Sequence, residues 1–325
     1  MRGSFIASLA AAAATGAFAA SPVDAQLPSW QPQPLEQPGA HVRIVGYNDM
    51  RDMLAPLVQQ FARAHRDIQI SLDLPGTRFA PAALATGQAV LAPMGGEMTP
   101  PQLADYRAAT GADPLVFRVA HATLDPLALS GPLAIFVHRD NPLTSLSLGQ
   151  VRQVFSGQVQ TWGELGAKGD WASRPISLYG MQQGTALAYE LKSRIMQSDQ
   201  FAATMRGFPQ SAQVVEQLST DVSGIGFAAG MRATSASRAL ALAPSSGESA
   251  IELTTGNLVD GTYPLGRDLL VYARRPLTPF AREFLRLLLS REGQLAVAAT
   301  PQGYLPLTAA QAQRERASLD TPSQP

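Results

Sequence analysis

Short runs typical of β-strands alternate with amphipathic stretches typical of helices along most of the chain, from residue 41 to residue 297. Residues 41–45 and 133–138 contain the β-branched side chains that favour strands. Residues 51–65 carry apolar side chains at helical spacing, and residues 279–297 are predicted to form one long helix. Such alternation predicts an α/β fold with largely parallel sheets. The 325 residues, 46% of them hydrophobic, are enough for one large domain or two ordinary ones.

A secretory signal peptide is predicted over residues 1–25. Arg2 gives a positive start, residues 5–14 form a short apolar run, and small-residue motifs place cleavage after Ala19 or Ala25. No later stretch has 18 consecutive apolar residues, so no direct membrane insertion is expected. The sequence has no cysteine, which excludes disulfides and a lipid-modified N-terminal cysteine. These features predict a free periplasmic protein, with a free extracellular protein as the alternative.

Two terminal segments are predicted to lie outside the folded part. Residues 26–41 contain four prolines among Gln, Ser and Gly, which predicts an extended tether. Residues 309–325 are polar and end in Thr-Pro-Ser-Gln-Pro, which predicts a flexible tail.

Charge and motifs argue against several classes of function. Lys+Arg and Asp+Glu each total 25, which gives no basic surface for nucleic acid. The sequence has no G-x-S-x-G elbow, H-E-x-x-H helix or P-loop, and its four histidines are far apart. We therefore expect neither an enzyme nor a metal or cofactor site, and no catalytic residue is assigned.

Four loops that each follow a predicted strand are the candidate binding site. They are residues 46–49, 75–78, 94–97 and 180–185. In open α/β sheets, ligands bind beyond the carboxyl ends of the strands, where glycine allows close approach and helix N-termini favour anions. The candidate ligand-binding residues are Tyr47, Asn48, Asp49, Gly76, Thr77, Arg78, Gly95, Gly96, Glu97, Met181, Gln182, Gln183, Gly184 and Thr185.

Several longer segments resemble the phosphate-binding component of the phosphate ABC transporter, within the type II periplasmic binding protein superfamily. Residues 148–166 (LGQVRQVFSGQVQTWGELG) are similar to a family segment built around FSG, and residues 214–230 to one ending in an IGY strand. Residues 263–267 (YPLGR) resemble the family's YPLSR, and residues 284–307 resemble its C-terminal helix and GYLPL tail. The resemblance extends from about residue 42 to residue 307.

The resemblance implies two α/β lobes, each a mixed sheet flanked by helices, joined by a two-strand hinge. Lobe 1 would comprise residues 42–124 and 258–308, and lobe 2 residues 125–257. A small ligand would lie between the lobes and be buried by hinge closure. A monomer that delivers its ligand to an ABC permease is expected.

The four loops depart from the family pattern at the positions that would hold an anion. Gly96 and Met181 stand where the family has arginine. Tyr47, Asn48 and Asp49 replace a first loop that carries hydroxyl donors. A buried phosphate needs hydrogen-bond donors on nearly every oxygen, and each lost charged contact removes about 1.5–3 kcal/mol.

Three functions remain open at this point. The first is a binder of phosphate or a related oxyanion, for transport or sensing, with Thr77, Arg78, Gly184 and Thr185 as its donors. The second is a binder of a neutral or zwitterionic polar solute, in which Asp49 or Glu97 pairs with a cation. The third is a periplasmic interaction protein with a degenerate ligand site.

Overall fold

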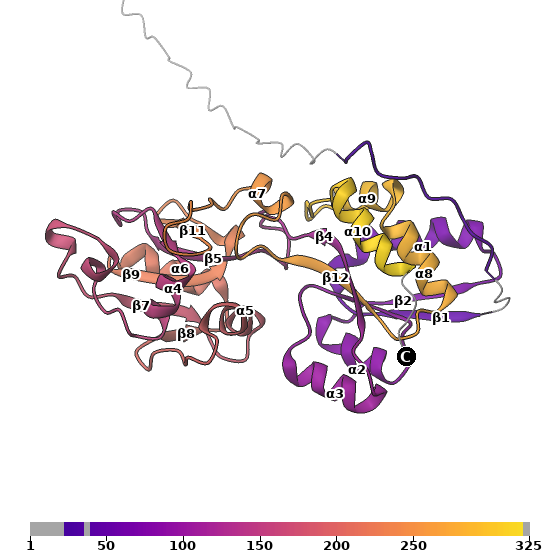
Figure 1. Cartoon of the computed structure of the whole chain (residues 1–325), viewed down its shortest axis with the longest axis horizontal. Helices are drawn as coiled ribbons and strands as arrows, with labels where there is room; N and C mark the ends of the chain where they lie inside the picture. The colour runs from indigo at the N-terminus through magenta and orange to yellow at the C-terminus, as the bar shows by residue number, and fades with distance from the viewer. Residues whose placement is uncertain (1–22, 36–39, 321–325) are drawn as a thin grey trace, which may run out of the picture.

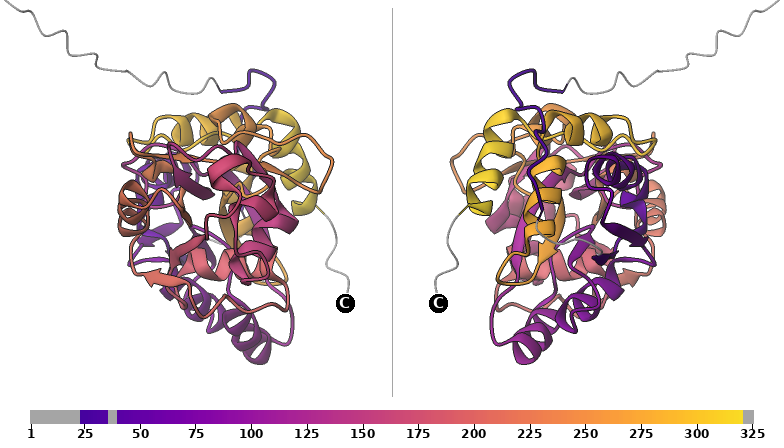
Figure 2. Two further views of the ribbon diagram at one scale, coloured as in Figure 1. Left: turned by 90° about the vertical axis from the view of Figure 1, so that its left-hand side faces the viewer. Right: turned by 90° about the vertical axis from the view of Figure 1, so that its right-hand side faces the viewer.

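The computed structural model describes residues 23–35 and 40–320, which form two lobes side by side along the long axis of the molecule (Figure 1). Seen along that axis, one lobe lies in front of the other (Figure 2). The predicted signal peptide falls mainly on residues 1–22, outside the described residues. Every helix in the described part is too short or too polar to cross a bilayer.

Lobe 1 is built on a five-stranded sheet in the order β2-β1-β3-β12-β4. Its strands are β1 (His41–Val45), β2 (Gln69–Asp73), β3 (Leu91–Met94), β4 (Leu115–His121) and β12 (Asp268–Ala273). The first three strands are parallel, whereas β12 runs antiparallel to both of its neighbours. The carboxyl ends of β1, β2, β3 and β4 therefore meet at one edge, where β12 begins.

Six helices cover the two faces of this sheet. They are α1 (Arg51–Ala64), α2 (Ala80–Ala85), α3 (Pro100–Thr110), α8 (Pro279–Leu288), α9 (Arg291–Ala298) and α10 (Ala309–Leu319). One core lies under α1, α8 and α9, where the rings of Phe61, Phe280 and Phe284 pack against one another. A separate core, which includes Tyr106, lies under α2 and α3.

Lobe 2 is built on a second five-stranded sheet in the order β10-β5-β9-β7-β8. Its strands are β5 (Leu133–His138), β7 (Ser177–Met181), β8 (Arg206–Phe208), β9 (Gly224–Ala229) and β10 (Ser237–Ala239), and a small parallel pair joins β6 (Ser145–Ser147) to β11 (Ala241–Ala243). Its helices are α4 (Leu148–Phe155), α5 (Ala186–Leu191), α6 (Ser211–Thr220) and α7 (Thr255–Val259). Trp162, Phe155 and Phe227 are fully buried in its core.

The sheets of both lobes contain parallel and antiparallel strands. The prediction of largely parallel sheets, made from strand–helix alternation alone, is therefore only partly confirmed. In lobe 2, β9 runs antiparallel to β5 and parallel to β7. Antiparallel neighbours arise because the chain crosses between the lobes twice instead of winding each sheet in one pass. The two lobes of mixed sheet flanked by helices are the architecture that the family resemblance implied.

The chain crosses from lobe 1 to lobe 2 over residues 122–132 and returns over residues 260–267, and these first and second crossings lie against each other. Ala122 N donates to Arg267 O at 2.8 Å, and Leu133 N donates to Leu265 O at 3.1 Å. At the lobe 1 end, His121 is buried, with Nδ1 2.7 Å from Asp268 Oδ1 and Nε2 3.1 Å from Gln311 Oε1. This side chain therefore links both crossing strands to the C-terminal helix.

The C-terminal expectations need two corrections. The predicted helix over residues 279–297 is two helices, because Ser290 accepts from Gly293 N and starts α9 as a new N-cap. The predicted flexible tail forms α10 as far as Leu319, with a capping box at Thr308 and Gln311. The tail sequence reads as polar because only a narrow face, including the fully buried Leu319, packs on lobe 1.

Residues 26–35 of the predicted tether form no helix or strand, but they pack on lobe 1, so the prediction of a free tether is wrong for this part. Leu27 is buried, and the Trp30 ring stacks on Phe61 at 6.0 Å. Trp30 Nε1 donates to the buried carboxylate of Glu283 at 2.8 Å. Figures 1 and 2 show this segment, in indigo, beside the C-terminal helices. The apolar side chains of this segment complete the core under α1, α8 and α9, and the segment is therefore held against lobe 1.

Candidate functional site

The first three predicted loops meet at the carboxyl edge of the lobe 1 sheet. Gly46 N donates to Asp73 O at 3.1 Å, Tyr47 N donates to Pro93 O at 2.8 Å, and Gly76 N donates to Gly46 O at 2.8 Å. Parallel strands bring their carboxyl ends together, and these backbone bonds join the loops that follow them. The structure therefore brings together three of the four predicted loops, residues 46–49, 75–78 and 94–97.

Small residues let these loops approach closely. A Cβ on Gly46 would lie 2.1 Å from Pro93 O, and a Cβ on Gly95 would lie 2.6 Å from the Tyr47 ring. Gly76 has φ 130°, a conformation that residues with a Cβ rarely adopt. The Thr77 hydroxyl accepts from Gly95 N at 3.3 Å and so connects the second loop to the third.

Asp49, a candidate ligand-binding residue, is buried, and the two hydrogen bonds that its carboxylate accepts come from within the protein. Its Oδ2 accepts from Leu129 N at 2.9 Å and from the Tyr304 hydroxyl. Leu129 belongs to the first crossing, and Tyr304 belongs to the C-terminal GYLPL segment. Asp49 therefore ties the first loop to two distant parts of the chain.

Two tyrosines beside Asp49 stay protonated at neutral pH. Burial, followed by the negative charge of Asp49, raises the pKa of Tyr47 to about 12. Burial and the neighbouring Tyr47 and Asp49 raise the pKa of Tyr304 still further. Both hydroxyls are therefore hydrogen-bond donors as well as acceptors.

Ser130 is a site residue that the sequence analysis missed. It is buried, and its hydroxyl donates to Gly95 O at 2.8 Å. No local motif marks it, since it lies in the first crossing, far in sequence from the loop that it contacts.

The remaining loop side chains of lobe 1 lie at the surface. Asn48, Arg78 and Glu97 are exposed, and the Arg78 guanidinium lies 4.6 Å from the centroid of the Phe79 ring. Neither Arg78 nor Glu97 forms an ion pair within residues 23–35 and 40–320.

The fourth loop lies in lobe 2, between β7 and α5. Met181 is buried in the lobe 2 core with its sulfur 3.4 Å from Ser211 Oγ, so its side chain is not directed into a cleft. Gln182, Gln183 and Gly184 are exposed. The Thr185 hydroxyl caps α5: it accepts from Ala188 N at 3.4 Å and donates to Gln182 O at 2.9 Å.

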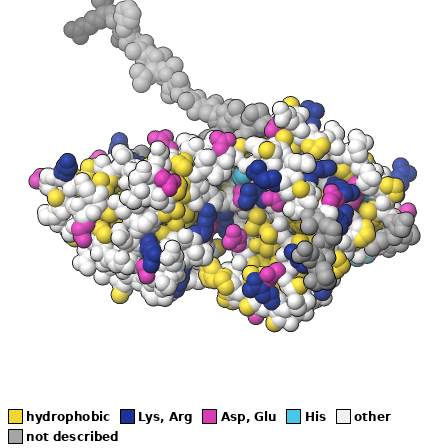
Figure 3. Space-filling model, viewed as in Figure 1, with side chains coloured by type: hydrophobic (Ala, Val, Ile, Leu, Met, Phe, Trp, Pro, Cys, Tyr) yellow, Lys and Arg dark blue, Asp and Glu magenta, His cyan; other side chains and the backbone are white. Residues whose placement is uncertain are grey.

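A charged cluster, which no sequence pattern predicted, connects α5 to lobe 1. Glu190 Oε1 pairs with Arg194 at 2.9 Å, and its Oε2 lies 3.7 Å from Arg267 Nε. Arg194 also donates to the backbone oxygens of Pro264 and Gly266, each at 2.8 Å. Figure 1 places α5 on the side of lobe 2 that faces lobe 1, and Figure 3 shows the surface indented between the lobes, with basic and acidic side chains at the junction.

Arg267 reaches from this cluster to the third loop. A Cβ on Gly96 would lie 2.3 Å from Arg267 Nη2, so the guanidinium occupies the space directly over that glycine. The arginine comes from the YPLGR segment, whose position next to the loops follows from the return of the chain to lobe 1.

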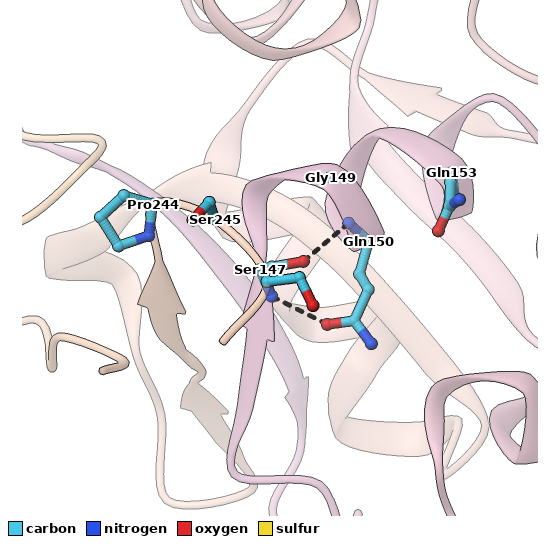
Figure 4. A pocket seen from close by; sticks show the side chains of 7 residues that line it. Ser147, Gly149, Gln150, Gln153, Pro244 and Ser245 are labelled. Carbon is cyan, nitrogen blue, oxygen red and sulfur yellow. Dashed lines mark hydrogen bonds between the residues drawn. The ribbon is translucent and has the colours of Figure 1, made fainter. Parts of the chain in front are cut away.

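A pocket of about 470 Å³ lies elsewhere, in lobe 2 at the start of α4 (Figure 4). Ser147, Gln150 and Ser245 are among its lining residues. Ser147 and Gln150 satisfy each other in a capping box, with bonds of 2.9 and 3.2 Å. Because this polar pair is already committed to the helix end, we place the functional site at the loops and not in this pocket. No cluster of three or more potential metal ligands is found in the described part of the chain.

Comparison with known proteins gives matches along most of the chain. A family model described as the PBP superfamily domain matches residues 28–292. Two curated relatives, both phosphate-binding protein PstS, come from Pseudomonas aeruginosa strains PAO1 and UCBPP-PA14. Each is 32% identical to this chain over 316 residues, which is 94% of both chains.

Solved structures show the same architecture. An ABC-type phosphate transport receptor from Vibrio cholerae has a TM-score of 0.57 at 17% identity and covers 81% of this chain and 99% of its own. PstS from Borrelia burgdorferi has a TM-score of 0.56 at 15% identity and covers 83% of this chain and 99% of its own. At these identities the structures establish a shared fold only.

Proposed function

We propose that this chain, which belongs to the PBP superfamily, is a periplasmic solute-binding protein that captures phosphate or a related oxyanion between its two lobes for an ABC permease. The observation that carries the proposal is the 32% identity to phosphate-binding relatives over 94% of both chains. Because the match includes both lobes and both crossings, it covers all the elements that border the space between the lobes.

The geometry of lobe 1 supports an oxyanion at the meeting point of the first three loops. Glycine backbone at Gly95 and Gly96, the phenol of Tyr47 and the guanidinium of Arg267 lie together there. Because Gly95 N already donates to Thr77, the donors suited to anionic oxygens are the backbone N–H of Gly96, the phenol and the guanidinium. Hinge closure would bring the fourth loop of lobe 2 over the ligand.

A neutral or zwitterionic solute is the alternative, and the exposed amides of Asn48, Gln182 and Gln183 favour it. Native mass spectrometry of freshly purified protein separates the two ligand classes. A co-purified neutral organic molecule would support the alternative, whereas a bound oxyanion would contradict it.

The direct test of the proposed function is thermal stability in phosphate. A ligand that binds only the folded state, at a thousand times its dissociation constant, adds about 4 kcal/mol to the free energy of unfolding. We therefore expect millimolar phosphate to raise the melting temperature by several degrees, with sodium chloride of equal ionic strength as the control. No rise with phosphate, arsenate or sulfate would contradict the proposal.

We also propose that the exported protein is cleaved after Ala19 and not after Ala25. Asp24 Oδ2 accepts from Ala309 N, at the start of α10, at 2.8 Å, and Oδ1 accepts from Gln26 N at 2.9 Å. These two bonds lower the pKa of the Asp24 carboxyl. Cleavage after Ala25 would remove Asp24 and its hydrogen bond to the start of α10, whereas cleavage after Ala19 would keep both.

The prediction is checked by the intact mass and N-terminal sequence of the protein released from the periplasm. We expect the mature chain to begin at Ala20. A chain that begins at Gln26 would show that this hydrogen bond is dispensable, and an uncleaved chain would contradict the predicted signal peptide.

A further inference from the structure

Arg267 is a mostly buried cation with unused donors. Its side chain is 16% exposed, and its Nε is buried without a hydrogen bond. Among the described residues, its guanidinium makes no hydrogen bond, and its single ion pair is the 3.7 Å contact with Glu190. A guanidinium carries five N–H donors, and leaving the buried Nε donor unpaired is costly, so this arrangement indicates a missing acceptor.

The neighbouring arginine does not share this property. Arg194 donates to Glu190 and to the backbone oxygens of Pro264 and Gly266, so its guanidinium is used in holding α5 against the second crossing. The ion pair between Arg194 and Glu190, at 2.9 Å, is closer than the 3.7 Å contact between Arg267 and Glu190. Within this cluster, Arg267 is therefore the cation whose charge and N–H donors are not fully paired by protein acceptors.

The surroundings of Arg267 fit a small anion. Its guanidinium lies over Gly96, where the absence of a side chain makes room for it. Its positive charge also acts on Tyr47, lowering the pKa that burial and Asp49 otherwise raise. A planar fork of N–H donors beside a phenol and glycine backbone can bind two oxygens of one tetrahedral oxyanion.

We propose that Arg267 is the residue that recognises the negative charge of the ligand, and that Glu190 is an internal carboxylate that competes with the ligand for this guanidinium. The inference rests on the proposed function, since it assigns the recognition of an oxyanion to a particular residue of the same site. Glu190 lies in lobe 2 and Arg267 at the edge of lobe 1, so an anion that displaces Glu190 exchanges an interlobe ion pair for a ligand contact.

The test is isothermal titration calorimetry with inorganic phosphate at constant ionic strength. Arg267→Ala should weaken binding by about tenfold to hundredfold, the loss expected for charge-assisted hydrogen bonds. Arg267→Lys should recover only part of the loss, because an ammonium cannot make the two parallel bonds. Glu190→Gln keeps an acceptor for Arg194 but removes the competing charge, and should tighten binding several-fold.

Arg152→Ala is the matched control. Arg152, in α4 of lobe 2, forms an ion pair with Asp199 at 2.7 Å and, among the described residues, no hydrogen bond or ion pair with the four loops. The variant therefore loses a paired arginine that does not contact the loops and should bind phosphate normally. If Arg267→Ala does not fold, Gly96→Ala provides the same test, because its Cβ would push the guanidinium out of place.

The outcomes separate the two proposals. Normal phosphate binding by Arg267→Ala, or by Gly96→Ala, overturns the role of Arg267 and leaves the proposed function standing. A larger loss in Arg78→Ala than in Arg267→Ala also overturns it, and weaker binding by Glu190→Gln overturns the competition. Absence of phosphate binding by the wild-type protein overturns the proposed function and, with it, this inference.

Discussion

Replacing Asp49 with alanine is expected to lower the free energy of unfolding by about 3 kcal/mol or more. The variant removes the acceptor of the buried Tyr304 hydroxyl and of the Leu129 N–H, which is part-buried. Each unsatisfied buried donor costs about 1–3 kcal/mol. Chemical denaturation, monitored by circular dichroism, measures this loss of stability. Part of the loss should come from weaker attachment of the first crossing to lobe 1.

Two milder variants divide this effect into its parts. Asp49→Asn keeps an oxygen that accepts both bonds and should lose about 1 kcal/mol. Tyr304→Phe removes one of the two donors and should lose a similar amount. If Asp49→Ala were as stable as Asp49→Asn, Asp49 would not have the anchoring role that its contacts indicate.

Replacing Gly46 with alanine is expected to cost about 3–4 kcal/mol of stability and to disorder the ligand loops. The added Cβ would lie 2.1 Å from Pro93 O and 3.0 Å from Pro93 Cδ. The atoms it meets belong to the backbone and ring of β3 and cannot turn away, so β1 and β3 must separate. The separation would break the bond from Tyr47 N to Pro93 O, now 2.8 Å.

Gly149→Ala is the control for this variant. Gly149 is an exposed residue of α4, and the nearest atom to an added Cβ is Ser147 Oγ at 3.8 Å. Alanine there should leave stability unchanged or raise it by up to about 1 kcal/mol, because glycine is a poor helix residue. Melting temperatures of the two variants provide the comparison, and a Gly46→Ala protein as stable as Gly149→Ala would contradict close packing of the loops.

Local patterns in the sequence were enough to predict most elements of both lobes. The strand over residues 133–138 and the capping box of Ser147 and Gln150 are found as expected. Their signals, β-branched composition and side chains three residues apart, act within one element. The local pattern did not predict the helix break at Ser290. The apolar side chains keep their helical spacing through this N-cap, so the pattern indicates one helix where there are two.

The candidate site divides in the same way. Loops that follow successive parallel strands could be placed together from strand order alone, and the bonds among Gly46, Tyr47 and Gly76 agree with that placement. The roles of the side chains could not be predicted. Asp49 is oriented inward by Leu129 and Tyr304, residues that become its neighbours only when the chain has crossed between the lobes and returned.

By itself, the sequence determined the succession of strands and helices, the loops at one sheet edge and the family resemblance, because each depends on residues close in the chain or on long matched segments. Only the tertiary structure decided that residues 309–319 form a packed helix and that Arg267 lies over Gly96 beside Glu190. Contacts of this kind join segments far apart in the chain. Burial and charge pairing at such contacts depend on how the two lobes and their crossings pack, which no local pattern records.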